Sequence, residues 1–108
     1  MGGAMIPAGA LTHVLTLERS LETVAASGGV VKAWKRKAVL RAQLVQRDTA
    51  EFLAGPGEAE ATRLVFRVRW REGITTADRI VYDGRAYDLR EVVELGRRDG
   101  LELRVVAT

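Results

Sequence analysis

Apolar and polar residues alternate through much of this chain, most clearly in residues 63–71. The even positions there are apolar and four of the five odd ones are arginines. The apolar residues are Leu64, Phe66, Val68 and Trp70, and the arginines are Arg63, Arg67, Arg69 and Arg71. Because successive side chains of a strand point to opposite faces, this segment predicts a β-strand with one buried face and one strongly basic face.

Residues 12–19, which are rich in β-branched and apolar residues, predict a further strand, and weaker alternation predicts strands at 30–46 and 101–107. Arg36 interrupts the apolar positions of the second of these segments, which favours a bend or a β-bulge close to it. Residues 25–29, AASGG, have the composition of a loop between the first two strands.

A hairpin is predicted around Asp83-Gly84. Residues 80–82 and 85–89 form its two arms, and Asp-Gly suits a two-residue type I′ turn because both central residues need a positive φ. Tyr82 and Tyr87 flank this turn and are available to pack against the core or a neighbouring strand.

Residues 47–61 separate the second and third predicted strands. Asp48 and Glu51 have the spacing of a capping box, which predicts one helical turn as far as Phe52. Gly55-Pro56-Gly57 then ends any helix. The segment is predicted to be a loop of about 15 residues, and unpatterned loops of that length are frequently functional.

These elements together predict an all-β fold of about six short strands, either a small antiparallel β-barrel or a sandwich. The long loop with its helical turn lies between strands 2 and 3. The chain has 108 residues, so we expect one domain over 5–108, with residues 1–11 as a flexible N-terminal segment.

The composition excludes several kinds of chemistry. There is no cysteine, which removes thiolate catalysis, disulfides and cysteine zinc sites, and a single histidine, His13, forms no metal cluster. No run approaches the roughly 20 apolar residues of a membrane helix, and the N-terminus lacks the pattern of a secretory signal. We therefore expect a soluble intracellular protein with no metal and no cofactor.

The polar residues do not form a recognisable catalytic set. Asp83 and Asp88 are better explained as a turn residue and a solvent-facing strand residue. Ser20 and Ser27 have no adjacent histidine or lysine to activate them. The sequence therefore predicts that the protein is not an enzyme.

The basic strand face leaves three interpretations open. It is a solvated face balanced by glutamates such as Glu91, Glu94 and Glu102, or a surface that binds phosphates, or a subunit interface. The net charge of +3 is compatible with nucleic acid but too small to establish it. Candidate contacts with DNA or with other subunits are Arg63, Arg67, Arg69, Arg71, Lys35 and Lys37.

The order of several segments carries a resemblance to a known family. They are MIPAGALTHVLTLER, SGGVVKAW, TAEF, REGITTADRIVYDGRAYDLREVVE and LELRVVA, and they cover roughly residues 5–107. In this ordered set the chain resembles the phage head–tail adaptor or head-closure (stopper) family, which includes prophage and gene transfer agent members. Arg41-Ala42 stands where many relatives carry Trp-Ala, and Gln46 stands where they carry a proline.

The resemblance implies a small β-barrel that assembles as a ring below the portal, in the neck of a virion that is itself assembled in the bacterial cytoplasm. The implied partners are the portal or adaptor protein, a tail protein, further copies of the chain and the packaged double-stranded DNA, with no membrane. In similar proteins the loop between strands 2 and 3 projects into the channel and helps to retain DNA. The matching candidates here are Arg47, Asp48, Glu51, Phe52, Gly55, Gly57 and Glu58. The alternative is a small basic β-barrel that binds nucleic acid directly.

Overall fold

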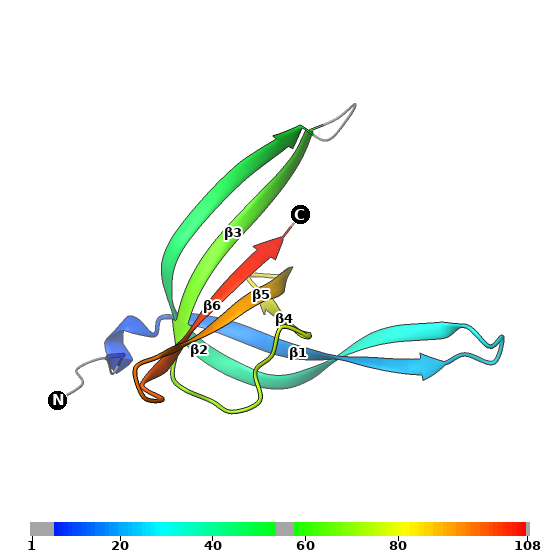
Figure 1. Cartoon of the computed structure of the whole chain (residues 1–108), viewed down its shortest axis with the longest axis horizontal. Helices are drawn as coiled ribbons and strands as arrows, with labels where there is room; N and C mark the ends of the chain where they lie inside the picture. The colour runs from blue at the N-terminus through cyan, green and yellow to red at the C-terminus, as the bar shows by residue number, and fades with distance from the viewer. Residues whose placement is uncertain (1–5, 54–57, 108) are drawn as a thin grey trace.

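The computed structural model describes the backbone of residues 6–53 and 58–107, and the side chains of the same residues apart from 49–60. This part of the chain is almost entirely β-structure (Figure 1). Its elements are the 3₁₀ turn η1 (Ala8–Ala10) and the strands β1 (His13–Val24), β2 (Val30–Leu53), β3 (Glu58–Val68), β4 (Asp78–Tyr82), β5 (Arg85–Leu95) and β6 (Gly100–Ala107). The all-β prediction is confirmed.

The strands close into an antiparallel barrel in the order β1-β2-β3-β6-β5-β4. The closing contact is the pairing of Thr16–Arg19 in β1 with Asp78–Val81 in β4. Closure removes the exposed edges that an open sheet would present over this stretch. Of the two predicted architectures, the structure therefore selects the barrel.

The alternation in the sequence places the core inside the barrel. Leu64, Phe66 and Val68 of β3 are buried, while Arg63 and Arg69 are exposed. The largest fully buried side chains come from β1, β3, β4 and β6: Phe66, Leu15, Leu17, Leu64, Ile80, Leu103, Val68 and Val105. Each such side chain contributes about 1.5–3 kcal/mol through removal from water.

The predicted hairpin turn between β4 and β5 is confirmed. Asp83 has a φ of 52° and Gly84 a φ of 77°, as a type I′ turn requires. Tyr87 is buried, and the ring of Tyr82 lies edge-on to that of Phe66 at a centroid distance of 5.1 Å. The turn therefore directs both tyrosines onto the core.

A β-bulge lies beside Arg36, as predicted. Leu17 pairs with Ala38 and Glu18 pairs with Arg36, so Lys37 is the extra residue of β2. Because a bulged residue leaves the alternation of its strand, the side chain of Lys37 is free to take a direction of its own.

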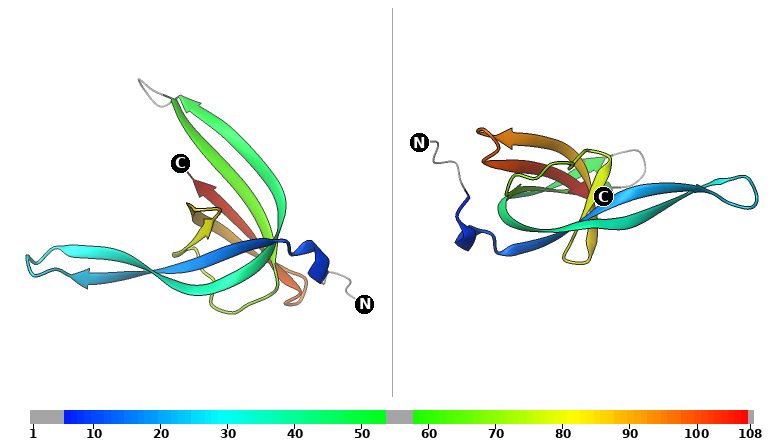
Figure 2. Two further views of the ribbon diagram at one scale, coloured as in Figure 1. Left: turned by 180° about the vertical axis from the view of Figure 1, so that it is seen from behind. Right: turned by 90° about the horizontal axis from the view of Figure 1, so that it is seen from below.

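Two pairs of strands continue beyond the barrel as ribbons, which leave it in different directions (Figures 1 and 2). The first, here called the arm, comprises residues 20–34 of β1, β2 and their connection. The second, here called the β2–β3 ribbon, comprises residues 47–61. The radius of gyration is 16.1 Å, whereas a compact chain of this length has about 13 Å. The ribbons account for this elongation.

The predicted helical turn from Asp48 to Phe52 is wrong, because these residues belong to β2. Pairing continues outward to Leu53 opposite Glu58, so the backbone groups of the segment bond across the ribbon instead of within a helix. A capping-box pattern is a local preference, and strand pairing overrides it here. Gly55 and Gly57, two of the candidate residues for DNA retention, lie outside the described residues.

Part of the N-terminal segment, for which the sequence predicts flexibility over residues 1–11, packs on the barrel. Ile6 and Leu11 are buried. An added Cβ at Gly100 would lie 3.0 Å from both Ile6 Cδ1 and the carbonyl oxygen of Val68. The absence of a side chain at Gly100 therefore allows residues 6–11 to lie against the end of β3 and β6.

Candidate functional site

The structure distributes the six predicted basic contacts over three different places. Arg63 and Arg67 lie on the outer face of β3, Lys35 and Lys37 lie on β2, and Arg69 and Arg71 follow the end of β3. The sequence placed all four arginines on one strand face, but β3 ends at Val68. They therefore do not form one continuous strip.

The outer face of β3 is largely balanced by acidic neighbours. Arg67 lies opposite Glu102 of β6, and the two side chains form an ion pair of 3.4 Å. Arg104 approaches Glu102 at 2.8 Å and Glu91 at 2.6 Å. Arg63 lies in register with Asp48 on the neighbouring strand. On this face the interpretation as a solvated, charge-balanced surface is the one supported by the contacts.

The pKa of the Arg104 guanidinium is raised above its ordinary value. The main cause is the hydrogen bond to Glu102, followed by the hydrogen bond to Glu91. Arg104 therefore stays fully charged and holds two carboxylates together on neighbouring strands.

The side chain of the bulged residue Lys37 binds the loop that precedes β4. Its Nζ donates to Asp78 Oδ2 at 2.9 Å and to the carbonyl oxygen of Gly73. Asp78 is buried and also accepts a hydrogen bond from the backbone N–H of Thr75. Lys37 is thus committed to a structural contact, while Lys35 is exposed on the arm side of the bulge.

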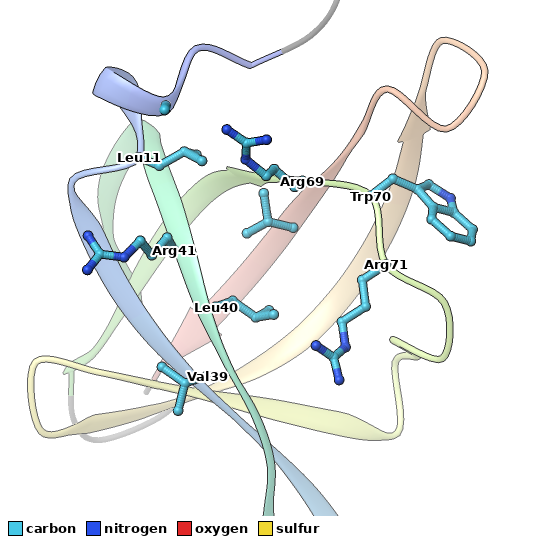
Figure 3. Close-up of a pocket in the computed structure, with 9 residues that line it drawn as sticks. Leu11, Val39, Leu40, Arg41, Arg69, Trp70 and Arg71 are labelled. Atoms are coloured by element: carbon cyan, nitrogen blue, oxygen red, sulfur yellow. The ribbon is translucent and has the colours of Figure 1, made fainter.

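A groove lies between β2 and the segment that follows β3 (Figure 3). Its volume is about 510 Å³, and its lining residues are Ala8, Leu11, Val39, Leu40, Arg41, Val68, Arg69, Trp70 and Arg71. Leu11 and Leu40 point into this space, and Arg69 and Arg71 lie beside it. This site, here called the arginine groove, combines an apolar floor with guanidinium groups on its rim.

The guanidinium groups of the arginine groove lack acidic partners. No hydrogen bond or ion pair joins the side chain of Arg41, Arg69 or Arg71 to any residue that the structure describes. Trp70 is held differently: its Nε1 donates to Glu94 at 3.2 Å, and Arg98 lies over its ring at 4.7 Å. Within the described part of the chain, the groove therefore gathers three guanidinium groups whose charge is uncompensated.

The root of the arm carries a cluster that the sequence reasoning missed. The Arg79 guanidinium lies 4.4 Å from the ring centre of Trp34 and forms an ion pair of 2.6 Å with Glu18. Lys32 lies over the same ring at 5.0 Å. A signal for the arm was present in the sequence, because Leu21, Val24, Val30 and Val31 flank the short loop on both sides.

The predicted gating residues belong to the β2–β3 ribbon. Arg47 and Asp48 are exposed on β2. Glu51 and Phe52 of β2 and Glu58 of β3 have described backbone only, and Glu51 is in register with Glu60. The ribbon therefore reaches away from the barrel, as the figures show for its described part (Figure 1).

The candidate catalytic groups stay apart. Asp83 lies exposed in the hairpin turn, and Asp88 is exposed and 3.7 Å from Arg90. Among the side chains that the structure describes, no three His, Asp or Glu residues come together as metal ligands.

No helix within the described ranges has the length and apolar character needed to cross a bilayer.

Comparison with solved structures identifies the same fold in two proteins. One is a chain from the virion of a native gene transfer agent particle, with a TM-score of 0.73 and 18% identity, covering 89% of this chain and 93% of the other. The second is protein SF1141 from Shigella flexneri 2a, solved in solution, with a TM-score of 0.64 and 18% identity over 93% of this chain and 95% of the other. No curated protein sequence matches the chain.

The sequence profile of a protein family supplies the remaining comparison. The profile of the phage head completion proteins matches residues 6–108, which includes the N-terminal segment, all six strands and both ribbons. This is a family of structural head proteins and not a family of enzymes. The chain belongs to the phage head completion protein family.

Proposed function

We propose that the protein is a head–tail connector that forms a ring below the portal, retains packaged DNA and offers the surface to which the tail attaches. The observation that carries the proposal is the family match over residues 6–108. The fold shared with a chain of a gene transfer agent virion supports it. The protein acts in the neck of the virion and is assembled into it in the bacterial cytoplasm.

The shape of the molecule suits a connector. A closed barrel gives each subunit a rigid body, and the two ribbons reach from it in different directions (Figure 2). Protruding strands can bind partners through their edges as well as their side chains. Its partners are the portal or adaptor protein on one side, a tail protein on the other, and further copies of the chain around the ring.

The β2–β3 ribbon is the element that we assign to DNA retention. The ribbon is acidic. It contains four carboxylates, Asp48, Glu51, Glu58 and Glu60, and a single cation, Arg47, which gives a net charge of −3. An acidic ribbon that projects into the channel repels DNA phosphates, so it can obstruct the DNA without binding it tightly. The same repulsion lets DNA pass once the ribbon has moved aside.

Direct binding of nucleic acid is the second candidate function. The observation that favours it is the uncompensated charge of Arg41, Arg69 and Arg71, since guanidinium groups without acidic partners are available to phosphates. The pairing of Arg67 with Glu102 weighs against a broad DNA-binding face on β3.

The proposal is tested with portal-bearing heads produced without this protein. Purified protein added while these heads package DNA in vitro is expected to sediment with them, to protect the packaged DNA from nuclease and to allow tails to join. Heads that lack the portal are the control and should bind none. Absence of association with portal-bearing heads contradicts the connector function, whereas association without DNA protection contradicts only the retention role.

A further inference from the structure

The outer part of the arm exposes aliphatic side chains without a core beneath them. β1 pairs with β4 only as far as Arg19, so residues 20–24 pair with β2 alone. The exposed fractions in this part are 43% for Leu21, 77% for Val24, 67% for Val30 and 48% for Val31. A two-stranded ribbon is only marginally stable in water, and exposed apolar patches mark binding surfaces. The arm therefore needs a partner surface.

The arginine groove offers a surface of matching character. Its floor is aliphatic, formed by Leu11, Leu40 and Val68, and Val39 beside it is 53% exposed. β3 pairs with β2 only from Ala42 onward, so the edge of β2 at residues 39–41 has no strand partner on that side within the described chain. The groove can therefore accept both apolar side chains and the backbone of an added strand.

The charges of the two surfaces are complementary. The arm carries two charged side chains, Glu22 on β1 and Lys32 in register with it on β2. The ammonium group of Lys32 lies over the ring of Trp34, and the carboxylate of Glu22 makes no hydrogen bond or ion pair with any described residue. Arg69 and Arg71 at the rim of the groove likewise have none (Figure 3). An apolar strand with one carboxylate fits an apolar groove flanked by arginines.

The arm cannot fill the groove of its own chain. The end of the arm and η1, which lies beside the groove, are at opposite ends of the long axis in every view (Figures 1 and 2). That axis measures 56 Å. We propose that the arm of one copy docks into the arginine groove of a second copy, with Glu22 facing Arg69 and Arg71. A contact between two different surfaces repeats from copy to copy and closes into a ring when the rotation permits.

This inference rests on the proposed function in one respect, because it supplies the subunit contact of the proposed ring. The absence of cysteine from the chain allows a direct test by thiol cross-linking. One preparation carries Leu21→Cys in the arm and the other carries Val39→Cys in the groove. A short bis-maleimide is added to the mixture, both with purified protein over a range of concentrations and within assembled particles.

The mixture is expected to give a cross-linked dimer, whereas the chain that carries both cysteines gives a ladder of larger products. Leu21→Cys mixed with Ala86→Cys, an exposed position on β5, is the matched control and should give no dimer. Cross-linking of Leu21→Cys only to itself, or no product with Val39→Cys in either setting, overturns the proposal. Cross-linking of the arm to a portal or tail protein identifies that protein as the occupant and also overturns it.

Charge reversal provides a second test of the proposal. Glu22→Arg and Arg71→Glu are each expected to lower the yield of the ladder by roughly tenfold, because like charges then meet at every contact. The chain with both substitutions restores an opposite-charge pair between positions 22 and 71, while Arg69 is unchanged, and it should recover part of the yield. Equal yields from all four chains contradict the proposal.

The subunit contact and the connector function are distinguished by different outcomes. If purified protein gives the arm-to-groove cross-links but the protein is absent from particles, the contact is supported and the connector function is contradicted. Protein present in particles without these cross-links leaves the connector function standing and contradicts the contact.

Discussion

Lys37 and Asp78 form an ion pair of 2.9 Å between a bulge of β2 and the first residue of β4. The side chain of Asp78 is 2% exposed and that of Lys37 is 25% exposed. Lys37 also donates to the carbonyl oxygen of Gly73, so one side chain holds both the loop and the strand that follows it. The pair therefore fixes the connection between β3 and β4 where it crosses the barrel.

Lys37→Ala is expected to lower the free energy of unfolding by about 2 kcal/mol, because it leaves the buried carboxylate with only a backbone donor. Denaturant unfolding measures this change. Asp78→Asn keeps an oxygen for the N–H of Thr75 but loses the charge. The loss of unfolding free energy in the double variant should be smaller than the sum of the two single losses, by about 1 kcal/mol.

The matched control for this pair is Lys35→Ala, two residues away and exposed. It is expected to change stability by less than about 0.5 kcal/mol. If both lysine variants unfold at the same denaturant concentration, the ion pair contributes nothing to stability.

Much of the barrel could be predicted because its determinants are local. The alternation of Leu64, Phe66 and Val68 specifies an inward face, and Asp83-Gly84 specifies the turn from two adjacent residues. Arg36 indicated the bulge because it breaks the alternation of its own strand. Each of these signals lies within a few residues of the feature that it predicts.

The features that were missed depend on distant parts of the chain. Lys37 meets Asp78 across 41 positions of sequence, and no local pattern contains that contact. The arginines separate because β3 ends at Val68, a boundary set by pairing with β2 and β6. Strand pairing likewise replaced the helical turn expected at Asp48. Local preference was correct only where tertiary pairing agreed with it.

Gly100→Ala is expected to loosen the N-terminal segment. The new Cβ would lie 3.0 Å from Ile6 Cδ1 and from the carbonyl oxygen of Val68, and the backbone oxygen cannot easily move. We expect a loss of about 1–2 kcal/mol in unfolding free energy. Amide hydrogen exchange should become faster in residues 6–12.

Gly9→Ala is the control for this substitution, since an added Cβ there meets nothing within 4 Å. It should leave both stability and exchange near the values of the unchanged protein. Unaltered exchange in Gly100→Ala would show that the segment does not depend on this contact.

Binding to naked duplex DNA distinguishes the two candidate functions. As a connector, the protein should bind duplex DNA only in the non-specific range, with Kd of about 10⁻⁴–10⁻⁶ M at physiological salt. Arg69→Glu with Arg71→Glu should weaken this binding more than Arg67→Glu, because Arg67 already faces Glu102. Fluorescence anisotropy against salt concentration provides the measurement. A much tighter, salt-dependent affinity that Arg69→Glu with Arg71→Glu abolishes would favour a nucleic-acid-binding function.

Shortening the β2–β3 ribbon tests its role in DNA retention. Ala50 and Ala61 are in register, so residues 51–60 can be replaced by Asn-Gly, which forms a type I′ turn between them. The barrel core lies outside the deleted segment, and the melting temperature should change little. Particles that carry this variant are expected to lose their DNA before tails join, measured as nuclease-sensitive genomes in purified heads.

The companion variant keeps the length of the ribbon and removes its charge, through Glu51→Gln, Glu58→Gln and Glu60→Gln together. If obstruction depends on length, these particles should retain DNA like the unchanged protein. If they leak as the shortened variant does, then electrostatic repulsion of phosphates is the retaining force. Full retention by the shortened variant contradicts the assignment of the ribbon to DNA retention, because no residue from 51 to 60 would then remain to block the channel.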